Sequence, residues 1–87
     1  MRFEFDLANG ANNKAKHGID FVDVQAHWAD PLLVEAPAKA EDQLRFLAIG
    51  QIDGKHWTAI CTLRGKAVRI VSVRRARQEE IGYCEST

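Results

Sequence analysis

Two alternating segments joined by Asp53-Gly54 constrain the fold of this chain more than any other feature of its sequence. In residues 45–52 and 56–63, one of the two alternating sets of side chains is apolar throughout. This is the period of a β-strand with a buried face. Asp-Gly is a dipeptide that favours the type I′ turn of a two-residue hairpin. The sequence therefore predicts an antiparallel hairpin near the middle of the chain.

Similar patterns predict three further strands, at residues 3–5, 32–36 and 67–73. Arg64-Gly65-Lys66 forms a second turn, and connections this short force neighbouring strands to be antiparallel. A polar connection is expected at residues 38–43. The last strand has two predicted faces, one with Val68, Ile70 and Ser72 and the other with Arg69, Val71 and Val73.

Helical patterns fill the rest of the chain. Asn9-Gly10 breaks the first strand pattern, and a helix is expected over residues 11–17, ended by Gly18. A second helix begins at the N-cap Asp20, with Asp23 completing a capping box, and ends at Asp30-Pro31. A short last helix is expected over residues 75–84.

These elements predict an α+β fold of order β-α-α-β-β-β-β-α, with an antiparallel sheet packed on two N-terminal helices. The other face of the sheet is then exposed. With 87 residues, the chain has room for one core, so we expect residues 1–87 to form a single domain.

Composition narrows the classes of protein. Hydrophobic residues make up 46% and charged residues 28%, as in ordinary soluble domains. No signal peptide and no membrane-spanning run is evident, so a cytoplasmic protein is expected. The two cysteines, Cys61 and Cys84, are expected to be reduced thiols. Because neither they nor the three scattered histidines have metal-ligand spacing, no metal and no cofactor is expected.

Charge is unevenly distributed although the net charge is zero. Residues 61–78 contain six basic side chains and no acidic one, and five of the six are arginine. A local field of one sign attracts anions whatever the total charge, and arginine binds phosphate or carboxylate in a bidentate manner. The segment is therefore a candidate site for RNA or for an acidic protein partner, with a solvated basic surface as the alternative.

Several motifs resemble those of one protein family, in the same order and over nearly the whole chain. They are Asn13 with Lys16-His17-Gly18-Ile19 and Phe21, Arg45 to Gly50, Thr62-Leu63-Arg64, Arg69 to Arg77, and Glu80. Together they resemble BrnT-type toxins of type II toxin–antitoxin systems. The resemblance implies a RelE-like fold and a ribonuclease that cleaves RNA and inhibits translation and growth. It also implies a BrnA-type ribbon-helix-helix antitoxin as partner, through which alone the toxin associates with operator DNA.

Metal-independent RNA cleavage uses the 2′-hydroxyl as nucleophile, and it needs proton transfer and cations around the phosphate. We expect Arg64 and Arg74 to bind the phosphate, with rim ion pairs or antitoxin contacts as the alternative. His17 is the candidate general acid or base, or else a helix-terminal residue bonded to backbone. Glu80 is either a base or the residue that positions Arg74 or Arg77. Weaker candidates for RNA contacts are Lys16, Arg69, Arg75 and Tyr83.

Other functions remain open at this point. The basic segment also suits a non-catalytic module that binds RNA or protein, or a degenerate toxin that binds only its antitoxin. The sequence has no glycine-rich phosphate loop, no nucleophile elbow and no pair of close carboxylates. Enzyme classes built on those motifs are therefore not expected.

Overall fold

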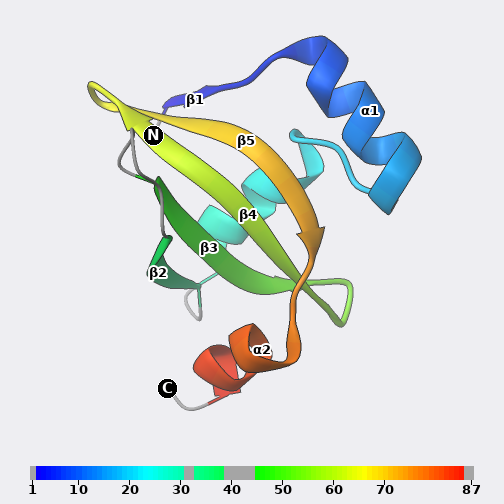
Figure 1. Ribbon diagram of the computed structural model, residues 1–87, viewed down its shortest axis with the longest axis vertical. Helices are drawn as coiled ribbons and strands as arrows, with labels where there is room; N and C mark the ends of the chain where they lie inside the picture. Colours follow the sequence, from blue (N-terminus) through cyan, green and yellow to red (C-terminus); the bar gives the residue numbers. More distant parts are fainter. Residues whose placement is uncertain (1, 31–32, 39–44, 86–87) are drawn as a thin grey trace.

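The computed structural model describes residues 2–30, 33–38 and 45–85, without the side chains of residues 37, 38 and 83–85. Its strands are β1 (Arg2–Glu4), β2 (Val34–Ala38), β3 (Arg45–Ile52), β4 (Lys55–Arg64) and β5 (Ala67–Arg75). They form one sheet of order β1-β5-β4-β3-β2 (Figure 1). The α+β class is confirmed. The all-antiparallel sheet is wrong, because β1 pairs in parallel with β5, to which no short turn connects it.

The central hairpin has the predicted geometry. Asp53 (φ 52°) and Gly54 (φ 78°) both adopt the left-handed conformation that a type I′ turn requires. β3 has the predicted bounds, whereas β2 lies two residues later than expected and includes Pro37. Proline is tolerated there because β2 is an edge strand with one unpaired side. Residue 32 of the predicted strand and residues 39–43 of the predicted connection lie outside the described residues.

A β-bulge changes the predicted faces of β5. Ile60 pairs with Ser72 and Cys61 pairs with Ile70, so Val71 is an extra residue on β5. Beyond it the alternation reverses, and Val73 is fully buried on the same face as Ile70. The prediction that placed Val73 opposite Ile70 is wrong, because a strict period of two does not allow for an inserted residue.

Helix α1 (Leu7–His17) begins four residues earlier than predicted. Asp6 caps it by accepting a hydrogen bond from the Asn9 N–H (3.1 Å). Asn9-Gly10 therefore lies inside the helix instead of breaking the pattern before it. Gly10 is buried and faces the ring of Phe21, which lies 3.6 Å from where a Cβ would be. Gly18 (φ 83°) ends the helix, as predicted.

The second helix, η1 (Asp23–Ala29), is a 3₁₀-helix and not the expected α-helix. The predicted capping box is present. Asp20 Oδ1 accepts from the Asp23 N–H (2.8 Å), and Asp23 Oδ2 accepts from the Asp20 N–H (3.4 Å). The segment brings Phe21 and Val24, both buried, into the core.

The two faces of the sheet carry different side chains, as the register shows. The inner face holds the core, which includes Ala48, Ala59, Cys61, Ile70 and Val73 with Ile19, Phe21 and Val24. The outer face carries Arg45, Ile49, Thr58, Thr62, Arg69 and Arg74.

The helices lie in three different places around the sheet (Figure 1). η1 packs on β3. α1 lies beside β5, where Asn13 Oδ1 accepts from the Val73 N–H (3.1 Å) beyond the end of β1. The last helix, α2 (Gln78–Glu85), contacts β3 and binds Thr58 on the outer face. The expectation that this face is open is therefore wrong at one end. Within the described ranges, every helix is too short or too polar to span a bilayer.

Candidate functional site

The predicted phosphate-binding arginines lie at opposite ends of the outer face. Arg64 is at the β4–β5 turn, whereas Arg74 pairs with Thr58 at the end covered by α2 (Figure 1). Six residues of β4 separate these two places, which corresponds to about 20 Å along a strand. The structure therefore does not bring Arg64 and Arg74 together around one phosphate.

Arg74 is held by Glu80. Its two terminal nitrogens donate to the two oxygens of the Glu80 carboxylate, at 2.7 and 2.8 Å. Glu80 Oε1 also accepts from the Thr58 hydroxyl (2.9 Å) and from the Arg77 N–H (2.7 Å). The Arg74 bond, opposed by burial, lowers the pKa of Glu80 to about 2. A carboxylate that accepts four bonds is a poor proton acceptor, so the geometry favours the positioning role for Glu80 over the role of a base.

Arg75 projects to the other face, because successive side chains of a strand alternate. Its guanidinium carbon lies 5.4 Å from the ring centroid of Trp57, within the range of a cation–π contact. Its Nε also donates to the His56 carbonyl (3.3 Å). Neither contact neutralises the charge of Arg75, which remains available to an anion.

Lys16 and His17 end helix α1 and are exposed. The His17 imidazole makes no side-chain hydrogen bond to any described residue, so the backbone-bonded alternative is not observed. His17 directly precedes Gly18, which lines a pocket on the inner side of the molecule. Lys14, by contrast, is engaged by Asp20 and Asp23, at 3.7 Å from each.

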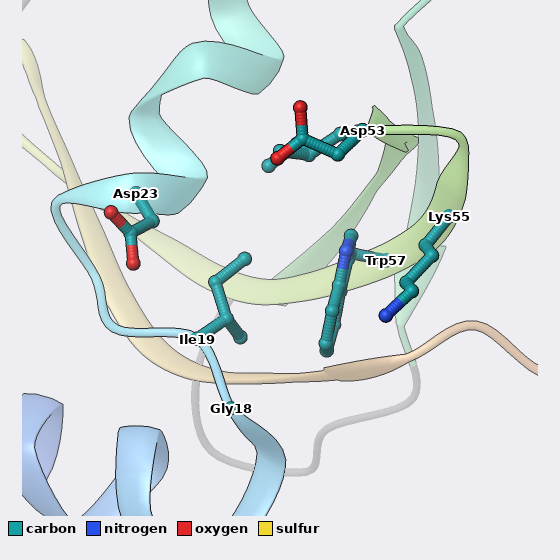
Figure 2. Close-up of a pocket in the computed structure, with 7 residues that line it drawn as sticks. Gly18, Ile19, Asp23, Asp53, Lys55 and Trp57 are labelled. Carbon is teal, nitrogen blue, oxygen red and sulfur yellow. The ribbon is translucent and has the colours of Figure 1, made fainter.

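This pocket has a volume of about 340 Å³. Its lining residues are Gly18, Ile19, Asp23, Ile52, Asp53, Lys55 and Trp57. Figure 2 shows the ring of Trp57 edge-on between Ile19 and Lys55, with the Asp53 carboxylate above them in this view. Trp57 belongs to the core and Asp53 to the turn, as their places in the strand and turn patterns predict, but the sequence did not show that both also line a pocket. The sequence signal for this part of the pocket was the Asp53-Gly54 turn, whose fixed geometry places Asp53 and the residue after the turn, Lys55.

Three arginines form the opposite end of the outer face. Arg45 and Arg69 flank Thr62 in the register of three adjacent strands, and Arg64 lies two residues further along β4. None of the three makes a side-chain hydrogen bond or an ion pair with the described residues. Arg45 lies outside the basic segment 61–78 in the sequence, and the pairing of β3 with β4 brings it to this group.

The remaining candidates add little to these sites. Tyr83 lies in α2, but its side chain is outside the described residues. His27 is fully buried, its Nε2 is 3.1 Å from the Trp57 carbonyl, and burial lowers its pKa. Cys61 is unbridged and buried, which raises its pKa to about 12. In the described part of the chain, no three His, Cys, Asp or Glu side chains converge as metal ligands.

Comparison with known proteins gives one match. Residues 5–80 match a protein-family model described as the ribonuclease toxin BrnT of type II toxin–antitoxin systems. A search of curated proteins finds no match. The matched range includes α1, the whole sheet from β2 to β5 and Glu80.

Proposed function

Because the chain belongs to the BrnT family of ribonuclease toxins of type II toxin–antitoxin systems, we propose that it is an endoribonuclease that acts in the cytoplasm and inhibits translation and growth. The family match over residues 5–80 carries this conclusion. Family membership also implies an RNA substrate and an antitoxin partner. We propose that the antitoxin is a BrnA-type ribbon-helix-helix protein and that it alone contacts operator DNA.

The proposed reaction is attack by the 2′-hydroxyl on the adjacent phosphodiester without a metal ion. His17 is the proposed general acid or base, since it is exposed, precedes Gly18 of the pocket in the sequence and has no hydrogen-bond partner among the described residues. Arg75, which projects to the same face as the pocket, is the proposed cation at the cleaved phosphate, and Arg74, on the opposite face, is proposed to bind a neighbouring phosphate. Glu80 fixes the fork of Arg74 by two hydrogen bonds and so acts as a positioning residue.

The arginines near the β4–β5 turn have a different proposed role. Arg64 lies about 20 Å along the strand from Arg74, and Arg45 and Arg69 lie about 13 Å from it, so we assign all three to the RNA backbone away from the cleaved bond. A strip of guanidinium groups that make no ion pair with described residues suits a polyanion that extends along the sheet. Lys16 and Tyr83 remain proposed contacts at the flanks.

A second candidate is a chain that binds RNA or its antitoxin without cutting. Two observations favour it: Arg64 and Arg74 do not meet, and the hydrogen bonds of Arg74 are largely taken up by Glu80. Both candidates predict binding of a polyanion, so only a cleavage assay separates them.

The test uses the purified full chain with a defined RNA in the presence of EDTA. We expect cleavage products that end in a 2′,3′-cyclic phosphate, and no product when the 2′-hydroxyl at the cut site is replaced by hydrogen. His17→Asn should lower the rate by about 10²–10⁴-fold with an unchanged unfolding midpoint. Cleavage only with added divalent metal would remove the metal-independent mechanism. No cleavage by folded protein would leave the second candidate.

A further inference from the structure

We propose that the pocket between the end of α1 and the β3–β4 turn is a nucleobase subsite that selects guanine. The inference rests on the proposed function, because it names the base of the RNA substrate that this ribonuclease would bind. It is carried by three features on the inner side of the molecule: a pocket with two rigid apolar residues, a carboxylate that no described residue binds, and two nearby cations.

The slot has the dimensions and walls that a base requires. Its volume of about 340 Å³ lies within the range of about 300–1,000 Å³ typical of small-ligand pockets. Ile19 and the ring of Trp57 stand on its two sides (Figure 2). Both walls are fixed by packing, since Ile19 is 3% and Trp57 7% exposed. Because so little of either side chain is exposed, the two form a rigid apolar floor against which a base can lie, and discrimination between bases must come from polar groups.

Asp53 supplies the unpaired polar group. Its side chain is exposed, and its carboxylate makes no hydrogen bond or ion pair with any described residue. The type I′ turn holds its backbone in place. Asp23, the other carboxylate of the pocket, already accepts from the Asp20 N–H (3.4 Å) and lies 3.7 Å from Lys14. Asp53 is therefore the group left for a ligand.

A carboxylate distinguishes guanine from the other RNA bases because it only accepts hydrogen bonds. Guanine presents two donors side by side, N1–H and the exocyclic amino group, which match the two oxygens of one carboxylate. Adenine and cytosine place an acceptor next to their amino group, and uracil has one N–H between two carbonyl oxygens. Each of these would turn a lone pair toward the second oxygen of Asp53.

Two cations, Arg75 and Lys55, lie close to the pocket and can bind the phosphate attached to the base. Arg75 packs on Trp57, one wall of the slot, and Lys55 lines the pocket on the side of Trp57 away from Ile19 (Figure 2). Their charges offset the repulsion between Asp53 and a nucleotide. The pocket therefore has groups for a base and for its phosphate, and it is lined by Gly18, the residue after His17 at the end of α1.

The test compares the wild-type protein with Asp53→Asn. Asparagine at this position also favours a type I′ turn before glycine, so the fold should be kept while one acceptor oxygen becomes a donor. Binding of guanosine and adenosine 3′-monophosphates is followed by tryptophan fluorescence, and cleavage by using oligonucleotides that contain a single guanine or adenine. We expect wild type to prefer guanine by about tenfold or more in both assays, and Asp53→Asn to lose this preference.

Glu35→Gln is the matched control, because it removes an exposed carboxylate of β2 that does not line the pocket. It should keep the guanine preference. Equal binding of the two nucleotides, a preference for adenine, or a preference unchanged in Asp53→Asn would overturn the subsite. Guanine binding without cleavage would instead overturn the ribonuclease proposal and leave the subsite, whereas cleavage without base preference would do the reverse.

Discussion

The two ends of the outer face use the same kind of side chain for opposite purposes. At the α2 end, Arg74 donates to both oxygens of Glu80, and the pair joins the helix to the sheet. At the other end, Arg45, Arg64 and Arg69 make no side-chain hydrogen bond or ion pair with described residues. The difference shows that an arginine-rich segment is not one functional unit, because its members divide between holding the fold and remaining available to an external anion.

The register of the sheet explains this difference. Thr58 and Arg74 are opposite each other beneath α2, so one carboxylate reaches both. At the other end, Arg69 is aligned with Glu4 of β1, but that carboxylate lies 3.8 Å from Arg2 instead. Among the described residues, Arg74 is therefore neutralised because α2 brings the Glu80 carboxylate to it.

The largest predicted effect is on the α2 end. Glu80→Gln should lower the free energy of unfolding by about 3 kcal/mol, since a pKa lowered from 4.5 to about 2 represents an interaction of that order. Urea unfolding at neutral pH measures it. Glu79→Gln, on the same helix turn and exposed, is the control and should change stability far less. Equal losses in the two variants would show that Glu80 acts only through helix charge.

The same pair predicts the acid sensitivity of the wild-type protein. Because the folded-state pKa of Glu80 is depressed, its contribution is present above the ordinary value of 4.5 and is lost as the pH falls toward about 2. Up to about 3 kcal/mol should disappear over this interval. Unfolding curves between pH 6 and pH 2 test this, and the difference between wild type and Glu80→Gln should shrink toward zero at the acid limit. A constant difference would contradict it.

Local sequence signals predicted the elements better than their arrangement. The Asp53-Gly54 turn and the Asp20 capping box were predicted, because the chemistry of each lies within a few residues. The parallel pairing of β1 and the bulge at Val71 were not, since both depend on contacts between distant segments. The start of α1 was missed because Asp6 caps a helix that tolerates Asn9-Gly10.

The candidate site shows the same limit. The motifs singled out Arg74 and Glu80, which lie six residues apart in the sequence. The sequence left two roles open for Glu80, a base or a residue that positions an arginine, and the structure shows its bond to Arg74. Arg64 was assigned to the same phosphate because it lies in the same basic segment, although about 20 Å of β4 separates Arg64 from Thr58, the residue opposite Arg74. The pocket could not be predicted, because its walls come from α1, η1 and the central hairpin.

The next prediction concerns Arg45 and Arg69, at the end of the outer face near the β4–β5 turn. Arg45→Ala combined with Arg69→Ala should weaken RNA binding by about tenfold at low salt and reduce the dependence of log affinity on log salt by about two. Stability should change little, because no internal ion pair is lost in the described residues. Fluorescence anisotropy at several salt concentrations measures both quantities. The control is Lys14→Ala, which removes a cation already paired with Asp20 and Asp23.

The smallest predicted effect isolates Arg64 from Arg74. Arg64→Gln should shift the thermal midpoint of unfolding by less than about 3 °C, because an exposed arginine without a described partner contributes little to folding. It should reduce the salt dependence of RNA binding by about one while leaving the cleavage rate at saturating RNA unchanged. Arg74→Gln, in contrast, leaves the Glu80 carboxylate without its partner and should destabilise the fold. If Arg64→Gln instead abolished cleavage at saturating RNA, the two ends of the face would have to act on one phosphate despite their separation.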